Sequence, residues 1–121
     1  MGGTGKRYLG SLLVALLALP KPTVALIVLR GEVVEPGCFV IGNRRGEAHR
    51  QCAIACARGG QDLAILDEKT RLLWLELPDR RAGAAEQQLL PHVAQRVEVR
   101  GTPYERGGMR GLRIETVRAL P

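Results

Sequence analysis

Aromatic side chains are scarce in this sequence of 121 residues, and no familiar catalytic signature is present. The aromatic residues make up 3% of the chain, and they are Tyr8, Phe39, Trp74 and Tyr104. A surface that stacks single-stranded bases needs more of them. No serine or cysteine nucleophile is accompanied by a base and an orienting acid, and no pair of carboxylates marks a catalytic site. We therefore expect no hydrolytic activity and favour a protein that is not an enzyme.

A long apolar run is also missing, although the amino-terminal residues come close to one. Residues 9–19 are almost all Leu, Val and Ala, follow Lys6 and Arg7, and end before a Pro-Lys-Pro segment. The run is too short to span a bilayer comfortably and has the length of a signal-peptide core. We expect residues 1–25 to be a signal peptide, with an uncleaved amino-terminal anchor as the alternative.

Export predicts a periplasmic, secreted or membrane-anchored protein, and it changes the charge that a partner meets. The whole chain carries a formal net charge of +6. Without Lys6, Arg7 and Lys21, 15 of the 18 basic residues remain against 12 acidic ones, a net charge of +3. This mildly basic, mixed surface is not the footprint of a nucleic-acid-binding protein. We expect a protein partner, with nucleic acid as a weaker alternative and membrane association through the amino terminus.

The remaining residues, 26–121, have the pattern of one mainly β domain. Residues 24–34 are rich in β-branched side chains and predict a long strand that bends at Gly31. Residues 63–66 and 71–77 are two apolar runs around a four-residue polar connection. This spacing is typical of a β-hairpin.

A helix and a second hairpin are expected in the rest of the domain. Helical spacing of apolar residues predicts a short helix over residues 84–90. Residues 97–100 and 112–117 then alternate apolar and charged side chains, with Gly107 and Gly108 between them. This alternation predicts two strands that each have one buried face.

The order of strand, hairpin, helix and hairpin resembles the OB fold, a five-stranded Greek-key barrel. Residues 29–34 (LRGEVV) and 92–101 (HVAQRVEVRG) carry the resemblance, and the second segment is similar to the V-x-V-x-G stretch of small exported bacterial OB-fold proteins. The resemblance covers residues 26–120 and implies a short helix between strands three and four. The chain departs from this pattern at residues 38–60, which we interpret as an insertion between strands one and two.

The insertion is expected to contain a short strand-like segment, a basic loop and a helix. Residues 38–41 are apolar and strand-like, and residues 42–46 form the loop. Residues 47–58 are rich in alanine, begin with glutamate and end with arginine before two glycines. These are the start and stop signals of a helix.

All three cysteines and one of the two histidines lie in this insertion. On the expected helix, His49, Cys52 and Cys56 fall within a sector of about 60°, so they point the same way. Cys38, from the strand-like segment, can supply a fourth ligand. We call these four residues the Cys3His cluster. The set suits tetrahedral zinc, with an iron–sulfur cluster or copper as alternatives.

The cysteines also have two explanations that need no metal. In an oxidising compartment, Cys38 can form a disulfide with Cys52 or Cys56 and tie the insertion to the barrel. Alternatively, the cysteines pack as small apolar side chains. The other histidine, His92, is expected to face solvent, and we assign it no role.

Two functions follow from these alternatives. The first is an exported metal-binding or redox accessory module that uses the Cys3His cluster. The second is an OB-fold binding module for a protein, an oligosaccharide or nucleic acid, in which the cysteines form a structural disulfide. In the second case, recognition would use barrel-face residues such as Trp74 and Tyr104.

Overall fold

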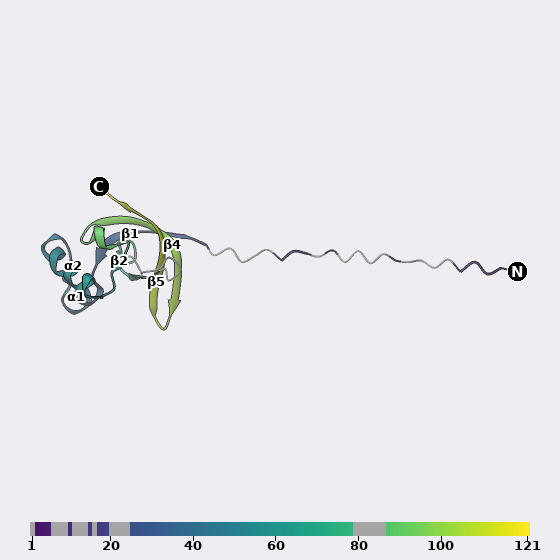
Figure 1. Ribbon diagram of the computed structural model, residues 1–121, viewed down its shortest axis with the longest axis horizontal. Coiled ribbons are helices and arrows are strands. Elements are labelled where there is room, and N and C mark those ends of the chain that lie inside the picture. Colours follow the sequence, from purple (N-terminus) through teal and green to yellow (C-terminus); the bar gives the residue numbers. More distant parts are fainter. Residues whose placement is uncertain (1, 6–9, 11–14, 16, 20–24, 79–86) are drawn as a thin grey trace.

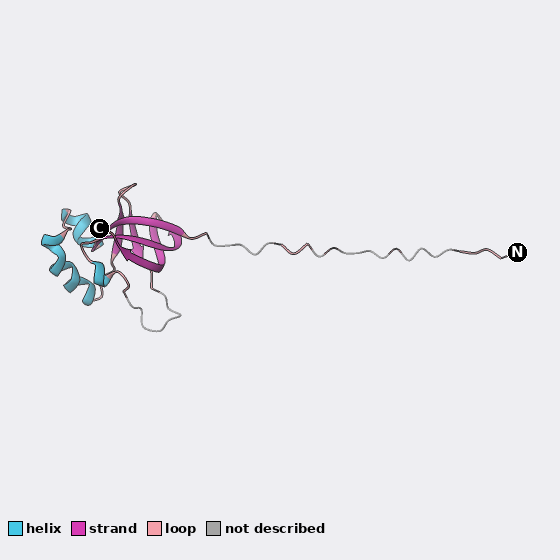
Figure 2. Cartoon of the chain, turned by 90° about the horizontal axis from the view of Figure 1, so that it is seen from above, coloured by secondary structure: helices cyan, strands magenta, loops and turns pink. Residues whose placement is uncertain are grey.

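The fold is mainly β, a closed five-stranded barrel with two α-helices side by side at one end (Figures 1 and 2). The computed structural model describes residues 2–5, 10, 15, 17–19, 25–78 and 87–121. Around the barrel the strand order is β1-β2-β3-β5-β4. The strands are β1 (Ile27–Val34), β2 (Ala64–Asp67), β3 (Leu73–Glu76), β4 (Arg96–Arg106) and β5 (Met109–Ala119).

Strand β1 closes the barrel because it pairs with two neighbours. Residues 27–32 pair with β4, and residues 31–34 pair with β2. Gly31 lies where these pairings overlap. A Cβ atom at this position would collide with the main-chain oxygen of Leu66 in β2. The absence of a side chain therefore allows β1 to turn from one neighbour to the other.

The structure confirms both expected hairpins. In the β2–β3 turn, the Asp67 carboxylate accepts hydrogen bonds from the Thr70 hydroxyl at 2.6 Å and the Lys69 amide at 3.2 Å. The β4–β5 hairpin is longer than expected, and its turn places Gly107 and Gly108 at φ values of 59° and 76°. Strands β3 and β5 then pair in parallel.

The barrel interior is filled by apolar side chains from several strands, one helix and one connection. Helix α2 (Arg50–Arg58) contributes Ala53 and Ala57, and the connection before β4 contributes Leu89 and Val93. The other buried members of this core are Val33, Leu63, Ile65, Val97, Val99, Leu112 and Ile114. A second, smaller cluster of Val34, Ala64 and Leu66 lies beneath Phe39.

The expected strand-like segment at residues 38–41 is wrong, because these residues belong to the helix α1 (Pro36–Gly42). Glu35 caps this helix: its carboxylate accepts from two amides of the first turn, at 3.1 and 2.6 Å. Asn43, at φ 50°, ends the helix. A short apolar run has no period that separates strand from helix, so the cap decides the structure here.

The expected helix at residues 47–58 is confirmed with one difference. It begins with a 3-10 turn, η1 (Glu47–His49), and continues as α2 (Arg50–Arg58). His49 is therefore the residue before α2 and does not share its helical geometry. The prediction that His49 lies on the same α-helix as Cys52 and Cys56 is wrong.

Two other expectations fall partly outside the described residues. A short helix was expected at residues 84–90, and residues 84–86 lie outside the described residues. The described chain that follows contains a 3-10 turn, η3 (Leu90–His92). Much of the expected leader, including residues 6–9 and 20–24, is outside as well. Among the described residues, no helix is both long and apolar enough to cross a membrane.

Glu76, at the end of β3, holds the connection before β4 against the barrel. Its side chain is buried, and its Oε1 accepts a hydrogen bond from the Leu89 amide at 3.2 Å. Burial raises the pKa of Glu76 to about 7, and the charge of Asp62 adds to this rise, while hydrogen bonds from Leu89 and Gln88 oppose it. The carboxyl group is therefore close to half ionised at neutral pH.

The close approach of β1 and β2 predicts that Gly31→Ala destabilises the barrel by about 1–3 kcal/mol, because the added methyl group must displace main-chain atoms. Gly59→Ala is the matched control, since a Cβ there meets only ordinary contacts, the nearest at 3.4 Å. Urea unfolding measures both variants. Equal stability of the two would contradict the account of barrel closure.

The pKa of Glu76 predicts how stability depends on pH. Between pH 4.5, the ordinary pKa of a glutamate, and about 7, the unfolded chain loses this proton while the folded chain keeps it. The contribution of Glu76 to stability therefore falls as the pH rises through this window, by about 3 kcal/mol in total. In Glu76→Gln this fall should disappear.

Urea unfolding of the wild-type chain and Glu76→Gln at pH 5 and pH 8 measures the difference between the two profiles. Glu105→Gln serves as the control, because Glu105 is exposed on β4. If the profiles of wild type and Glu76→Gln run parallel, burial does not control the ionisation of Glu76.

Candidate functional site

The four residues of the Cys3His cluster all lie in the connection between β1 and β2. This connection, residues 35–60, contains α1, η1 and α2 and is here called the helical cap. It sits at the end of the barrel where β1 finishes, away from the end where β1 starts at Ile27 (Figure 1). The cap is therefore remote from the point at which the amino-terminal residues join the barrel.

α1 is fixed to the barrel by one apolar and one polar interaction. Phe39 packs over Val34, Ala64 and Leu66, together with side chains of β3. Glu35 is 5% exposed and bonds the first turn of the helix. These contacts hold Cys38, in the first half of α1, at the edge of the barrel.

α2 presents its two cysteines beside its buried face. Ala53 and Ala57 face the core and are 4% and 3% exposed. Cys52 and Cys56 precede them by one residue each, so they form a neighbouring row on the helix, one turn apart. Cys52 is exposed and Cys56 is half-buried.

Cys38 and Cys56 line the same pocket between α1 and α2. The pocket has a volume of about 230 Å³, and its other lining residues are Glu35, Gly37, Ile41, Arg44 and Gln61. Two loop amides bond to the main chain beside the cysteines: Arg44 donates to the carbonyl of Cys38 at 3.2 Å, and Gln61 donates to that of Cys56 at 3.0 Å. The structure therefore brings one thiol from each helix to a common cavity.

The Glu35 carboxylate controls the state of the Cys38 thiol. The thiol donates a hydrogen bond to Glu35, which, together with burial and the charge of Glu35, raises the pKa of Cys38 to about 12. The charges of Cys56 and Cys52 raise it further, because thiolates close to one another repel. These three sulfurs are thus within electrostatic reach of one another.

Glu35 itself is affected by His49. Burial alone would raise the pKa of Glu35, but hydrogen bonds from Cys38 and Gly37, together with the electrostatic effect of His49, outweigh burial and lower it. The Glu35 carboxylate is therefore within electrostatic reach of both Cys38 and His49. Sequence analysis did not identify Glu35 as part of the site. Its position directly before a proline at the start of a helix was the available signal.

His49 has a buried ring nitrogen with no hydrogen-bond partner. Its Nε2 atom is shielded from solvent, and no group among the described residues bonds to it. Buried polar atoms almost always have a partner, so such an atom needs an explanation. A bound ion is one explanation, because a neutral imidazole nitrogen is a metal ligand.

The four residues of the Cys3His cluster lie on one cap but do not form a complete metal site. All three cysteines are free thiols. Within the part of the chain that the structure describes, no three His, Cys, Asp or Glu side chains converge closely enough to hold a metal ion as they stand. Cys52, the exposed member, lies at the outer edge of the cluster.

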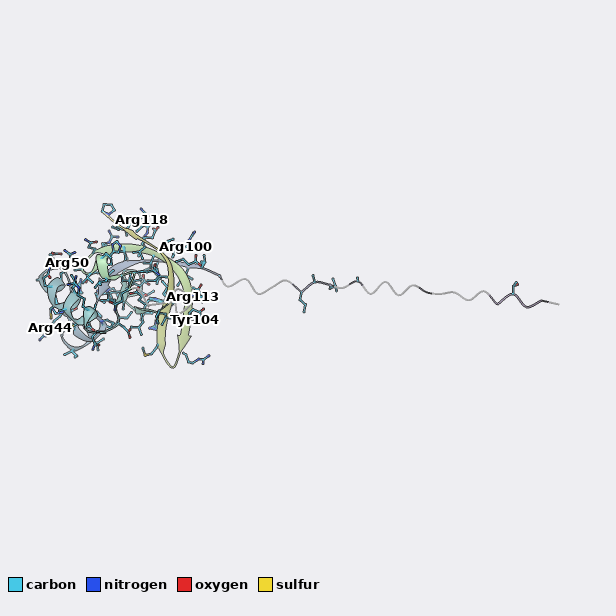
Figure 3. All side chains as sticks on the ribbon, viewed as in Figure 1. Arg44, Arg50, Arg100, Tyr104, Arg113 and Arg118 are labelled. Atoms are coloured by element: carbon cyan, nitrogen blue, oxygen red, sulfur yellow. The ribbon has the colours of Figure 1, made fainter. Side chains whose placement is uncertain are left out.

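The remaining candidate residues lie on other parts of the surface. Arg44 and Arg50 lie on the helical cap, whereas Arg100, Tyr104, Arg113 and Arg118 lie along β4 and β5 (Figure 3). The Arg113 guanidinium stacks over the Tyr104 ring at 5.8 Å. Glu98 bonds both Arg30 and Arg118, at 2.8 and 3.0 Å, which reduces the basic character of that surface. Trp74 is half-buried and packs against the barrel core.

Comparisons with known proteins return no match: no family model, no curated protein and no solved structure matches this chain. The function of the site therefore has to be inferred from its own geometry and chemistry.

The thiol environments predict an order of alkylation by iodoacetamide in the metal-free protein. Cys52 should react fastest because it is exposed, and Cys38 slowest because Glu35 keeps its thiol protonated. Glu35→Gln should accelerate the alkylation of Cys38, since the substitution removes the charged acceptor of the thiol hydrogen bond. Mass spectrometry of labelled peptides measures each rate. Glu47→Gln, on the same cap, is the control, and an unchanged Cys38 rate in Glu35→Gln would refute the role of Glu35.

Proposed function

We propose that this protein is an exported accessory module that binds a metal ion through Cys38, His49, Cys52 and Cys56. The buried, unpartnered Nε2 of His49 carries the proposal. It occurs on the same cap as three free thiols that influence one another electrostatically. A cation would bond this nitrogen and remove the repulsion between the thiolates.

Zinc is the ion that best fits these ligands. Three thiolates and one imidazole form a common tetrahedral zinc site, and an iron–sulfur cluster or copper are the alternatives. The ligands must lose their protons and move together as the metal binds. Cys38 and Cys56 already share a cavity, so the largest movement falls to Cys52, whose exposure leaves it free to turn.

A metal-binding role is favoured over thiol–disulfide exchange. A redox-active cysteine is an exposed thiol with a lowered pKa. The pKa of Cys38 is instead raised to about 12 by the hydrogen bond to Glu35. Displacement of this proton by a metal ion would convert the protected thiol into a ligand.

We also propose that the barrel is OB-like. Support comes from its five strands, their closure in the order β1-β2-β3-β5-β4, and the location of the cap in the loop between strands one and two. In OB folds this loop is one of those that bind ligands. An exported module of this kind would act with a protein partner. Val40 and Ile41, which are 71% and 86% exposed beside the site, offer that partner an apolar contact.

The second candidate function is a binding module whose cysteines form a structural disulfide. The common cavity of Cys38 and Cys56 favours this pair over any other. In an oxidising compartment the bond would tie α1 to α2 and leave Cys52 free. The barrel face, with Trp74 and Tyr104, would then carry recognition.

We expect the full chain, purified without a polyhistidine tag, to bind about one equivalent of zinc. Cys56→Ser and His49→Ala should each weaken binding by more than about tenfold, because each removes a ligand. Metal analysis and competition with a chromophoric chelator measure stoichiometry and affinity. His92→Ala is the matched control, since His92 is the only other histidine and lies outside the cap.

The number of free thiols after denaturation separates the two candidate functions. Less than about half an equivalent of metal, together with fewer than the three thiols present in the sequence, would reject the metal site and support the disulfide. Retention of full zinc affinity in His49→Ala would reject the assignment of His49 as a ligand.

A further inference from the structure

A second and larger pocket lies between the end of α2, the start of β2 and the connection before β4. Its volume is about 650 Å³, within the range of about 300–1,000 Å³ that is usual for sites that bind small molecules. Apolar side chains form much of its wall, and they include Ala57, Leu63, Leu90 and Pro91. The cavity is thus suited to a small ligand with an apolar body.

One buried carboxyl group lines this cavity and has an oxygen without a hydrogen-bond partner. Glu76 lines the pocket and is 8% exposed. Its Oε1 accepts from the Leu89 amide, but its Oε2 is shielded from solvent and has no partner among the described residues. An unpaired carboxylate oxygen in such a place is costly, and a donor supplied by a ligand would remove that cost.

The charges around the pocket favour a cationic donor. Asp62 also lines it, and its charge opposes the ionisation of Glu76. Arg58, on α2, is the one basic side chain among the described lining residues, and it is exposed. A positively charged ligand would satisfy Oε2 and stabilise the ionised carboxylate at the same time.

We propose that this pocket binds a small organic amine, whose ammonium group donates to Glu76 Oε2 while its apolar body packs against Leu90 and Pro91. The pocket is separate from the Cys3His cluster. Gly60 and Asp62 line it, whereas Gln61, between them, lines the cysteine pocket. The proposed amine site and the proposed metal site therefore use different residues.

Phenethylamine is a suitable probe because it combines an ammonium group with an aromatic body. The amide signals of Leu89, which bonds to Glu76, and of the adjacent Gln88 report on the site in two-dimensional NMR. Titration of the full chain with phenethylamine should move these signals saturably. Phenethyl alcohol and phenylacetate, of similar shape but neutral and anionic, should bind at least about tenfold more weakly.

Two variants test the two parts of the pocket. Glu76→Gln keeps the size of the side chain and should weaken phenethylamine binding by about tenfold. Leu90→Trp keeps the carboxylate but fills the apolar part, and it should also weaken binding. Glu105→Gln is the control for the loss of one exposed negative charge and should have no effect. The dispersion of the amide spectrum shows that each variant is folded.

Several results would overturn the proposal. One is the absence of a saturable shift with phenethylamine. Another is equal binding of phenethylamine and phenethyl alcohol, which would make the pocket a purely apolar site. A third is the same loss of affinity in Glu105→Gln as in Glu76→Gln, which would reduce the effect to net charge. Zinc binding is measured separately, so failure of the amine site leaves the metal site untouched, and the reverse also holds.

Discussion

Closure of the barrel through β1 is the constraint on which the other features depend. β1 pairs with β4 along its first part and with β2 along its last part, so it must turn between two neighbours within eight residues. This turn requires a residue without a side chain at Gly31. β1 finishes and β2 begins at the same end of the barrel. The chain between them leaves the barrel at this end and re-enters it there. The helical cap is this return path, and its location follows from the pairing of β1.

Glu35 connects barrel closure to the candidate metal site. It follows β1 directly, caps α1 through two main-chain amides and accepts a hydrogen bond from the Cys38 thiol. The same carboxylate that starts the helix therefore keeps the thiol protonated. Glu35 is 5% exposed, so its carboxylate makes these bonds away from solvent. Fold and site share this residue.

Strand β4 was predictable because it buries one face, which the alternation of Val97, Glu98 and Val99 records directly. Strand β2 is buried at every position, and it was predictable as a short apolar run next to a polar turn. The helix that carries Cys38 was not predictable, because its short apolar run has no period that separates helix from strand. Its start depends on the cap geometry of Glu35. Proximity of the four cluster residues in the sequence identified the candidate site. It did not reveal the 3-10 turn that separates His49 from α2, or the isolation of its Nε2 atom.

Two of the three buried carboxyl groups in the described residues, Glu35 and Glu76, differ in how completely they are hydrogen-bonded. Glu35 and Glu76 are 5% and 8% exposed, so both have lost most of their contact with water. Glu35 accepts enough hydrogen bonds that its pKa is lowered despite burial. Both of its carboxylate oxygens have a hydrogen-bond donor. Glu76 has one bonded and one unbonded oxygen, and burial raises its pKa. The difference between them is one missing donor. His49 Nε2 lacks a partner in the same way, as do Glu32 Oε2, Arg50 Nε, His92 Nδ1 and Arg110 Nε among the described residues. The proposed metal ion and the proposed amine would each supply the partner that His49 or Glu76 lacks.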